Sequence, residues 1–123
     1  MSKEDKLFDL EDRLIDFAVR IIKVSESLPK SRTGNHIAGQ LLRCGTSPAP
    51  NYGEAQGAES RSDFIHKMKI CLKELKESKV WLRMIVQAEL ITPSNKLDAL
   101  IDECDQLISI FFSSIQTAKL NKD

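Results

Sequence analysis

The sequence predicts an all-α fold, an antiparallel up-down four-helix bundle. In four segments, apolar residues recur at three- and four-residue steps, which is the spacing of an amphipathic helix. No segment alternates apolar and polar residues as a half-buried strand does. The connections between segments are short, which places consecutive helices antiparallel. The expected helices cover about 5–28, 34–58, 61–90 and 93–119, within a single domain over 1–123.

The first helix is expected to end before a proline. Leu28 precedes Pro29, and the residue before a proline is sterically pushed out of the helical region. The apolar face of this helix consists of Leu7, Leu10, Leu14, Phe17, Ile21, Val24 and Leu28.

The second helix is expected to begin near Thr33 or Asn35 and to end near Gly57 or Ala58. Its apolar positions are Ile37, Leu41, Leu42 and Cys44. Residues that are unfavourable inside helices follow: Gly45, Pro48, Pro50 and Gly53. Two structures therefore compete, a break near Ser47 or one long helix that the prolines kink.

Capping residues mark the last two helices. Ser60 opens the third, and Ser60-x-x-Asp63 resembles a capping box. Thr92 is expected to cap the fourth, with Pro93 at its first position, where a missing amide donor costs nothing. The third apolar face consists of Phe64, Met68, Cys71, Leu72, Leu75, Leu82, Ile85 and Val86. The fourth consists of Leu97, Leu100, Ile101, Cys104, Leu107, Ile108, Phe111, Phe112 and Ile115.

Composition excludes several classes of protein. The 18 basic and 18 acidic residues give no net charge, which argues against nucleic-acid binding by bulk electrostatics. No apolar run approaches the roughly 18 residues of a membrane span. The polar, acidic N-terminus does not resemble a secretory signal, so we expect a cytoplasmic protein.

No residues are arranged for metal binding or catalysis. The 3 cysteines, Cys44, Cys71 and Cys104, are far apart and are expected to be reduced and packed as small hydrophobic residues. His36 and His66 lie on different helices without ligand partners at a suitable spacing. The chain has no phosphate-binding loop and no nucleophile with its base. The sequence therefore predicts no enzyme, metal, cofactor or small-molecule substrate.

Basic side chains gather on one side of the third helix. On a wheel at roughly 100° per residue they fall within an arc of about 120°. This basic ridge consists of Lys69, Lys73, Lys76, Lys79 and Arg83. It can contact the phosphates of RNA, or it can be a solvated face with ion pairs such as Lys73–Glu77. No aromatic residue interleaves with the ridge to stack on bases.

Trp81 lies at the border of the same helix's apolar face, on the flank opposite the basic ridge. As the only tryptophan, it can close the core or anchor a subunit interface, where tryptophan is enriched. Glu74 and Glu77 share its flank, which favours a partly polar interface.

Two stretches, Gln40 to Trp81 and Phe8 to Lys30, resemble the bacterial proteins encoded in intervening sequences of 23S ribosomal RNA, also called S23-type. That family forms four-helix bundles, and its assembled members are ring-shaped homopentamers. The resemblance therefore implies a homo-oligomer and favours one long helix over 34–58. Two positions depart from the family pattern: Gly45, where alanine is usual, and Pro48, where isoleucine is frequent.

The part most like the family motif is Asn51-Tyr52-Gly53-Glu54-Ala55, with asparagine and glutamate about one turn apart. The resemblance implies a polar network, which either fixes helix register or forms a binding site. Lys73 or Arg43 would be its countercharge. The members of this expected network are Arg43, Asn51, Glu54, Glu74 and Glu77.

The sequence thus predicts a self-assembling helical scaffold whose partner is a protein or an RNA. The alternative is an RNA-binding protein that uses the basic ridge. A more distant similarity is to the accessory protein of diversity-generating retroelements, which binds a reverse transcriptase and nucleic acid through a strongly basic surface. The zero net charge of this chain departs from that protein.

Overall fold

A computed structural model describes the backbone of residues 3–121 and the side chains of residues 10–121. Every regular element in these residues is helical, as the sequence predicts. The elements are α1 (Lys3–Ser27), α2 (Arg32–Thr46), α3 (Pro48–Gln56), α4 (Arg61–Gln87), the 3-10 helix η1 (Ser94–Leu97) and α5 (Asp98–Leu120).

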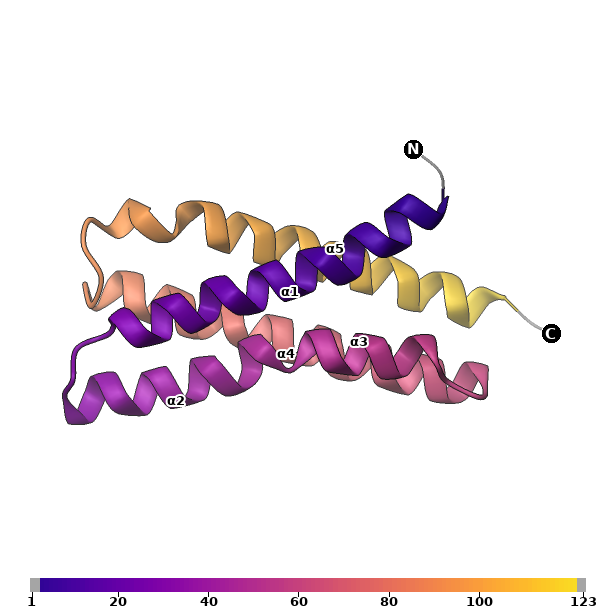
Figure 1. Ribbon diagram of the computed structural model, residues 1–123, viewed down its shortest axis with the longest axis horizontal. Coiled ribbons are helices and arrows are strands. Elements are labelled where there is room, and N and C mark those ends of the chain that lie inside the picture. Colours follow the sequence, from indigo (N-terminus) through magenta and orange to yellow (C-terminus); the bar gives the residue numbers. More distant parts are fainter. Residues whose placement is uncertain (1–2, 122–123) are drawn as a thin grey trace.

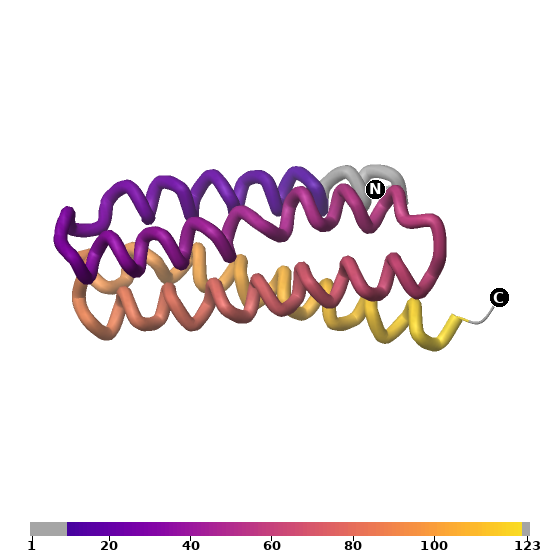
Figure 2. Tube along the Cα trace, turned by 90° about the horizontal axis from the view of Figure 1, so that it is seen from below, coloured from indigo at the N-terminus to yellow at the C-terminus, as the bar shows by residue number. Residues whose placement is uncertain are grey.

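The helices form an elongated bundle in which α2 and α3 follow one another along one line (Figure 1). Neighbouring helices run antiparallel, so α1 begins and α5 ends at the same end of the bundle. Figure 2 shows two layers, one of α1 with α2 and α3, the other of α4 with α5. The outer side of the α1–α2 pair is therefore opposite the outer side of the α4–α5 pair.

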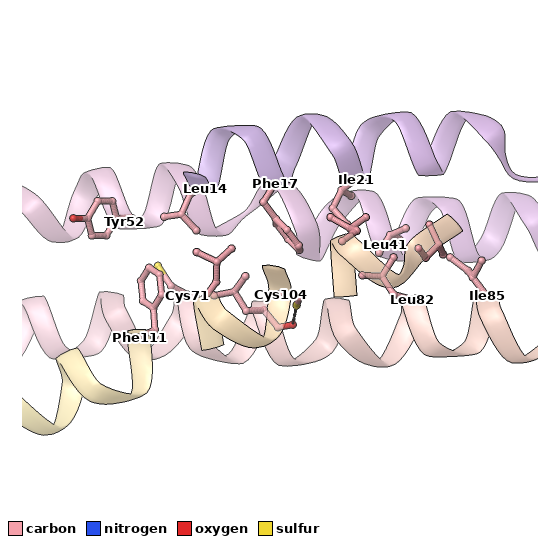
Figure 3. Packing of buried hydrophobic residues seen from close by; sticks show 14 of the residues in the cluster. Leu14, Phe17, Ile21, Leu41, Tyr52, Cys71, Leu82, Ile85, Cys104 and Phe111 are labelled. Atoms are coloured by element: carbon pink, nitrogen blue, oxygen red, sulfur yellow. Dashed lines mark hydrogen bonds between the residues drawn. The ribbon is translucent and has the colours of Figure 1, made fainter. Parts of the chain in front are cut away.

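The core lies between these two layers (Figure 3). Side chains such as Phe17 and Leu82 are fully buried, and their removal from water is the main force that holds the layers together. The buried cluster comprises Leu14, Phe17, Ile21, Leu28, Ile37, Leu41, Tyr52, Ala55, Met68, Cys71, Leu75, Leu82, Ile85, Leu97, Leu100, Cys104, Leu107, Phe111 and Ile115.

The helix expected over 34–58 is divided at Ser47. This residue keeps helical angles (φ −69°, ψ −37°), so the chain continues in nearly the same direction. Pro48 and Pro50 have no amide hydrogen, which interrupts the ladder of hydrogen bonds. The ladder resumes where the Asn51 amide donates to the Ser47 carbonyl at 3.3 Å. The structure therefore combines the two alternatives, two helices in line with one residue between them.

Two serines cap helices. Ser60 is extended, and its hydroxyl accepts from the Asp63 amide at 3.0 Å, which confirms it as the N-cap of α4. The cap of α2 is Ser31, whose hydroxyl accepts from the Gly34 amide at 3.0 Å. The second helix thus begins at Arg32, slightly before the expected start.

The start predicted for the last helix is wrong. Pro93 is extended (φ −67°, ψ 156°) and precedes η1, so it does not occupy the first position of a helix that Thr92 caps. The α-helix begins at Asp98. Two expected core residues are also exposed, Leu42 by 39% and Phe112 by 52%. Each follows a fully buried residue by one position, which rotates it out of the core.

Candidate functional site

The basic ridge lies on the solvent side of α4. Lys69, Lys73, Lys76 and Arg83 are exposed. Lys79 is half-buried because it reaches α5, where its Nζ lies 2.6 Å from Asp105 Oδ1. Among the side chains that the structure describes, Lys79 is the one ridge member with an ion-pair partner. The other ridge cations remain available to an anionic ligand.

The other flank of α4 faces α2, and there the structure joins three of the five residues of the expected network. The Arg43 guanidinium pairs with the Glu74 carboxylate at 3.2 Å and with the Glu77 carboxylate. Glu77 also accepts from Trp81 Nε1 at 3.1 Å. The ring of His36 meets Trp81 edge-on, with centroids 6.0 Å apart. This arrangement ties α2 to α4.

The rest of the expected network is separate. Asn51 donates to the Ser47 carbonyl at 3.0 Å and to the Ser47 hydroxyl at 2.9 Å, across the proline break. Glu54 pairs with Lys67 at 2.9 Å, and this hydrogen bond raises the pKa of Lys67. The expectation that Lys73 or Arg43 balances Glu54 is therefore wrong. The spacing of Asn51 and Glu54 serves two local contacts, not one network.

Trp81 packs against the hydrophobic core while its indole nitrogen stays at the edge of the α2–α4 contact. An aromatic side chain with one polar end suits this position. The structure thus gives Trp81 a place within the monomer, and its use at a subunit interface stays a prediction.

All three cysteines are free and buried. Burial raises the pKa of both Cys71 and Cys104 to about 12. Burial also raises the pKa of Cys44, which accepts from the Ser78 hydroxyl at 3.3 Å. Thiols with such pKa values are neutral at physiological pH and do not act as nucleophiles there.

Reasoning from the sequence missed an apolar face on the outer side of the α1–α2 pair. Three of its residues, Ile15, Val19 and Ile22, follow at steps of four and three on α1, with exposed fractions of 48%, 41% and 41%. Leu42 of α2 lies one turn before Gly45, which abuts Ile21 of α1, so it is on the α1 side of its helix. We call Ile15, Val19, Ile22 and Leu42 the apolar face. The spacings of four and three residues are visible in the sequence, but Ile15, Val19 and Ile22 lie outside the apolar stripe of this helix that was assigned to the core.

Within residues 10–121, whose side chains the structure describes, no cluster of histidine, cysteine, aspartate or glutamate has the arrangement of a metal site. The same residues include no helix with the length and apolar content to cross a membrane.

Residues 8–113 match the family described as 23S rRNA-intervening sequence protein. A solved structure from Bacteroides thetaiotaomicron VPI-5482 is 33% identical and superposes with a TM-score of 0.79. The similarity covers 86% of this chain and 97% of that protein, which is described as a member of the S23 ribosomal protein family with unknown function. Among curated proteins, none matches the sequence.

Proposed function

Because this chain belongs to the family of 23S rRNA-intervening sequence proteins, we propose that it is a non-enzymatic helical bundle that assembles with copies of itself. The observation that carries the proposal is the apolar face of α1 and α2. Single exposed apolar residues are ordinary on protein surfaces, whereas a contiguous group marks an interaction site.

The spacing within the apolar face suits another helix. Ile15, Val19 and Ile22 repeat at four and three residues, the pattern of side chains that interdigitate between packed helices. These side chains are already about half buried, so covering the rest contributes roughly 1 kcal/mol for each. A second copy of the chain is the proposed occupant, and the resemblance noted above leads us to expect a ring of five.

The double variant Val19→Glu/Ile22→Glu tests this proposal in analytical ultracentrifugation. We expect the wild type to sediment as an oligomer and the variant to sediment as the 13.9 kDa chain, because a buried carboxylate without a partner is costly. The control is Val80→Glu on α4, where a similarly exposed apolar residue lies outside the apolar face. It should leave the oligomer intact. Loss of the oligomer in the control but not in the double variant would place the interface elsewhere.

Trp81 gives a second comparison. Trp81→Ala should lower the stability of the monomer, since Trp81 packs on the core, and should leave the number of subunits unchanged. If this variant instead dissociated the oligomer without loss of helix stability, Trp81 would be the interface anchor.

A second candidate function is binding of a nucleic-acid backbone by the basic ridge. The specific observation in its favour is that Lys69, Lys73, Lys76 and Arg83 are exposed and have no ion-pair partner among the described side chains. A row of cations on one helix concentrates positive potential locally, even though the whole chain is neutral.

The charge reversal Lys73→Glu/Lys76→Glu tests this candidate. Affinity for nucleic acid should fall steeply with rising salt and should be lost in this variant. The control Lys23→Glu/Lys96→Glu changes the net charge equally at exposed lysines outside the ridge and should retain binding. Equal loss in both variants would mean that net charge, not the ridge, decides.

A further inference from the structure

We propose that the α4–α5 side of the bundle binds single-stranded nucleic acid, with the basic ridge on phosphates and Phe112 of α5 stacked on a base. This inference rests on the second candidate function and adds the class of ligand. It depends on the packing of α5 against α4, which the sequence of α4 alone cannot show.

Two contacts fix how α5 lies along α4. Lys79 pairs with Asp105 at 2.6 Å, and the Cys104 thiol donates to the Leu75 carbonyl at 3.2 Å. Phe112 lies seven residues after Asp105, which is two turns further along the same face of α5. Because the helices are antiparallel, the first contact places Phe112 near the level of Leu72 and the second places it near the level of Lys67, so it lies between these two levels of α4.

Three ridge cations lie within about one turn of these levels. They are Lys69, Lys73 and Lys76, all exposed. The packing of α5 on α4 therefore sets an aromatic ring beside the part of the ridge whose lysines have no partner among the described side chains. No aromatic residue of α4 interleaves with the ridge, but α5 supplies one, Phe112.

Phe112 is 52% exposed, and it is the one aromatic among the large exposed apolar residues that the structure describes. The phenyl ring has no polar atom, so its exposure serves no hydrogen bond within the bundle. Every base has a π-face, and stacking on an aromatic ring is tolerant of sequence. Stacking needs an unpaired base, whereas the bases of a duplex already stack on each other. An exposed ring beside cations that have no partner among the described side chains thus favours a single strand.

The dimensions of the face also suit a strand. The ridge from Lys69 to Arg83 covers about 21 Å of helix at 1.5 Å per residue, enough for several nucleotides. Toward the start of α4, a hollow of about 440 Å³ continues this surface, lined by Ile65, His66 and Lys69 with Arg61 and Ser62. The α4–α5 pair is the layer opposite α1 and α2 (Figure 2), so contacts at the apolar face would leave it open.

Fluorescence anisotropy with labelled probes tests the inference. The probes are a mixed-sequence RNA of about 15 nucleotides, the DNA of the same sequence and the corresponding RNA duplex, a length within the range that one small domain covers. The proteins are wild type, Phe112→Leu, Phe112→Trp and Lys73→Glu/Lys76→Glu. Leucine keeps an apolar side chain of similar size but cannot stack, and circular dichroism checks that each variant is folded.

The expected result is that wild type binds a single strand better than the duplex. Phe112→Leu should weaken single-strand binding roughly 5- to 100-fold, and Phe112→Trp should preserve it. The charge-reversal variant should lose all binding. If the lysines matter and Phe112→Leu binds as wild type does, the single-strand inference is overturned while nucleic-acid binding stands. If no probe binds at about 50 mM salt, both fail.

Discussion

Gly45 shows how one missing side chain sets the contact between α1 and α2. A Cβ at this position would lie 2.6 Å from Cγ2 and 2.7 Å from Cγ1 of Ile21. Ile21 is fully buried and β-branched, so it has little freedom to move away. The close approach of Ile21 leaves no room for a Cβ, so glycine fits this position.

Gly45→Ala should therefore lower the free energy of unfolding by about 1–3 kcal/mol, the usual cost of overpacking a core. Urea denaturation followed by circular dichroism measures it. Two other glycines lie inside helices, Gly39 in α2 and Gly53 in α3, and an added Cβ at either would meet nothing within 4 Å. Gly39→Ala and Gly53→Ala should instead stabilise by about 0.5–1 kcal/mol. An equal effect at all three positions would contradict the packing at Gly45.

The buried thiols make stability depend on alkaline pH. Burial raises the pKa of Cys71 and Cys104 to about 12 in the folded chain, while the unfolded thiols ionise near their ordinary value. Below about pH 9 the folded and the unfolded chain both keep the thiol protons, so these thiols do not make the free energy of unfolding depend on pH. Above it the unfolded state loses protons first, which favours unfolding.

Between about pH 9 and 12, we expect the free energy of unfolding to fall by up to about 1.4 kcal/mol per pH unit for each thiol. Other groups titrate in this range, so the measurement is the difference between wild type and Cys71→Ala/Cys104→Ala. The variant is less stable at neutral pH but should have a shallower decline. Parallel curves would show that the thiols are accessible to water.

Among the secondary-structure elements, the four helical segments were predictable because their apolar residues recur at regular three- and four-residue steps. Their ends were less so, because the local backbone decides them. Pro48 and Pro50 announced an interruption, but only the dihedral angles of Ser47 show that α3 continues the line of α2. The helix α4 ends at Gln87, although apolar residues continue to Ile91.

The reason for that stop is a Schellman motif. Glu89 is left-handed with φ 55°, its amide donates to Val86 at 3.1 Å, and the Leu90 amide donates to Ile85 at 3.0 Å. Glycine is the residue that usually occupies this conformation, so a glutamate at this position does not indicate that the helix ends.

Glu89→Gly should raise the free energy of unfolding by about 1 kcal/mol, because it removes the strain of a side chain in the left-handed region. The matched control is Ala88→Gly, next to it but with φ −84°, which should destabilise slightly. Thermal and urea unfolding measure both. Stabilisation by the control, or a loss of stability in Glu89→Gly, would contradict this account of how α4 ends.

Across the whole molecule, the apolar face and the basic ridge belong to opposite layers of the bundle, an arrangement that the sequence alone does not show. The sequence identified the basic ridge because its residues share one helix. The apolar face and the position of Phe112 depend on how helices pair, through Gly45 with Ile21 and through Lys79 with Asp105. Pairing over long sequence separations is set by packing, and one helix's periodicity does not record it. The same limit explains why Arg43 and Glu54 were assigned to one network.

Under the proposed function, the apolar face joins copies of this chain. The most direct test is the mass of the wild-type protein in solution, measured by light scattering during size-exclusion chromatography over a range of concentrations. The predicted result is a defined multiple of 13.9 kDa, with five copies expected. A mass of 13.9 kDa at every concentration would show that the chain does not associate with itself.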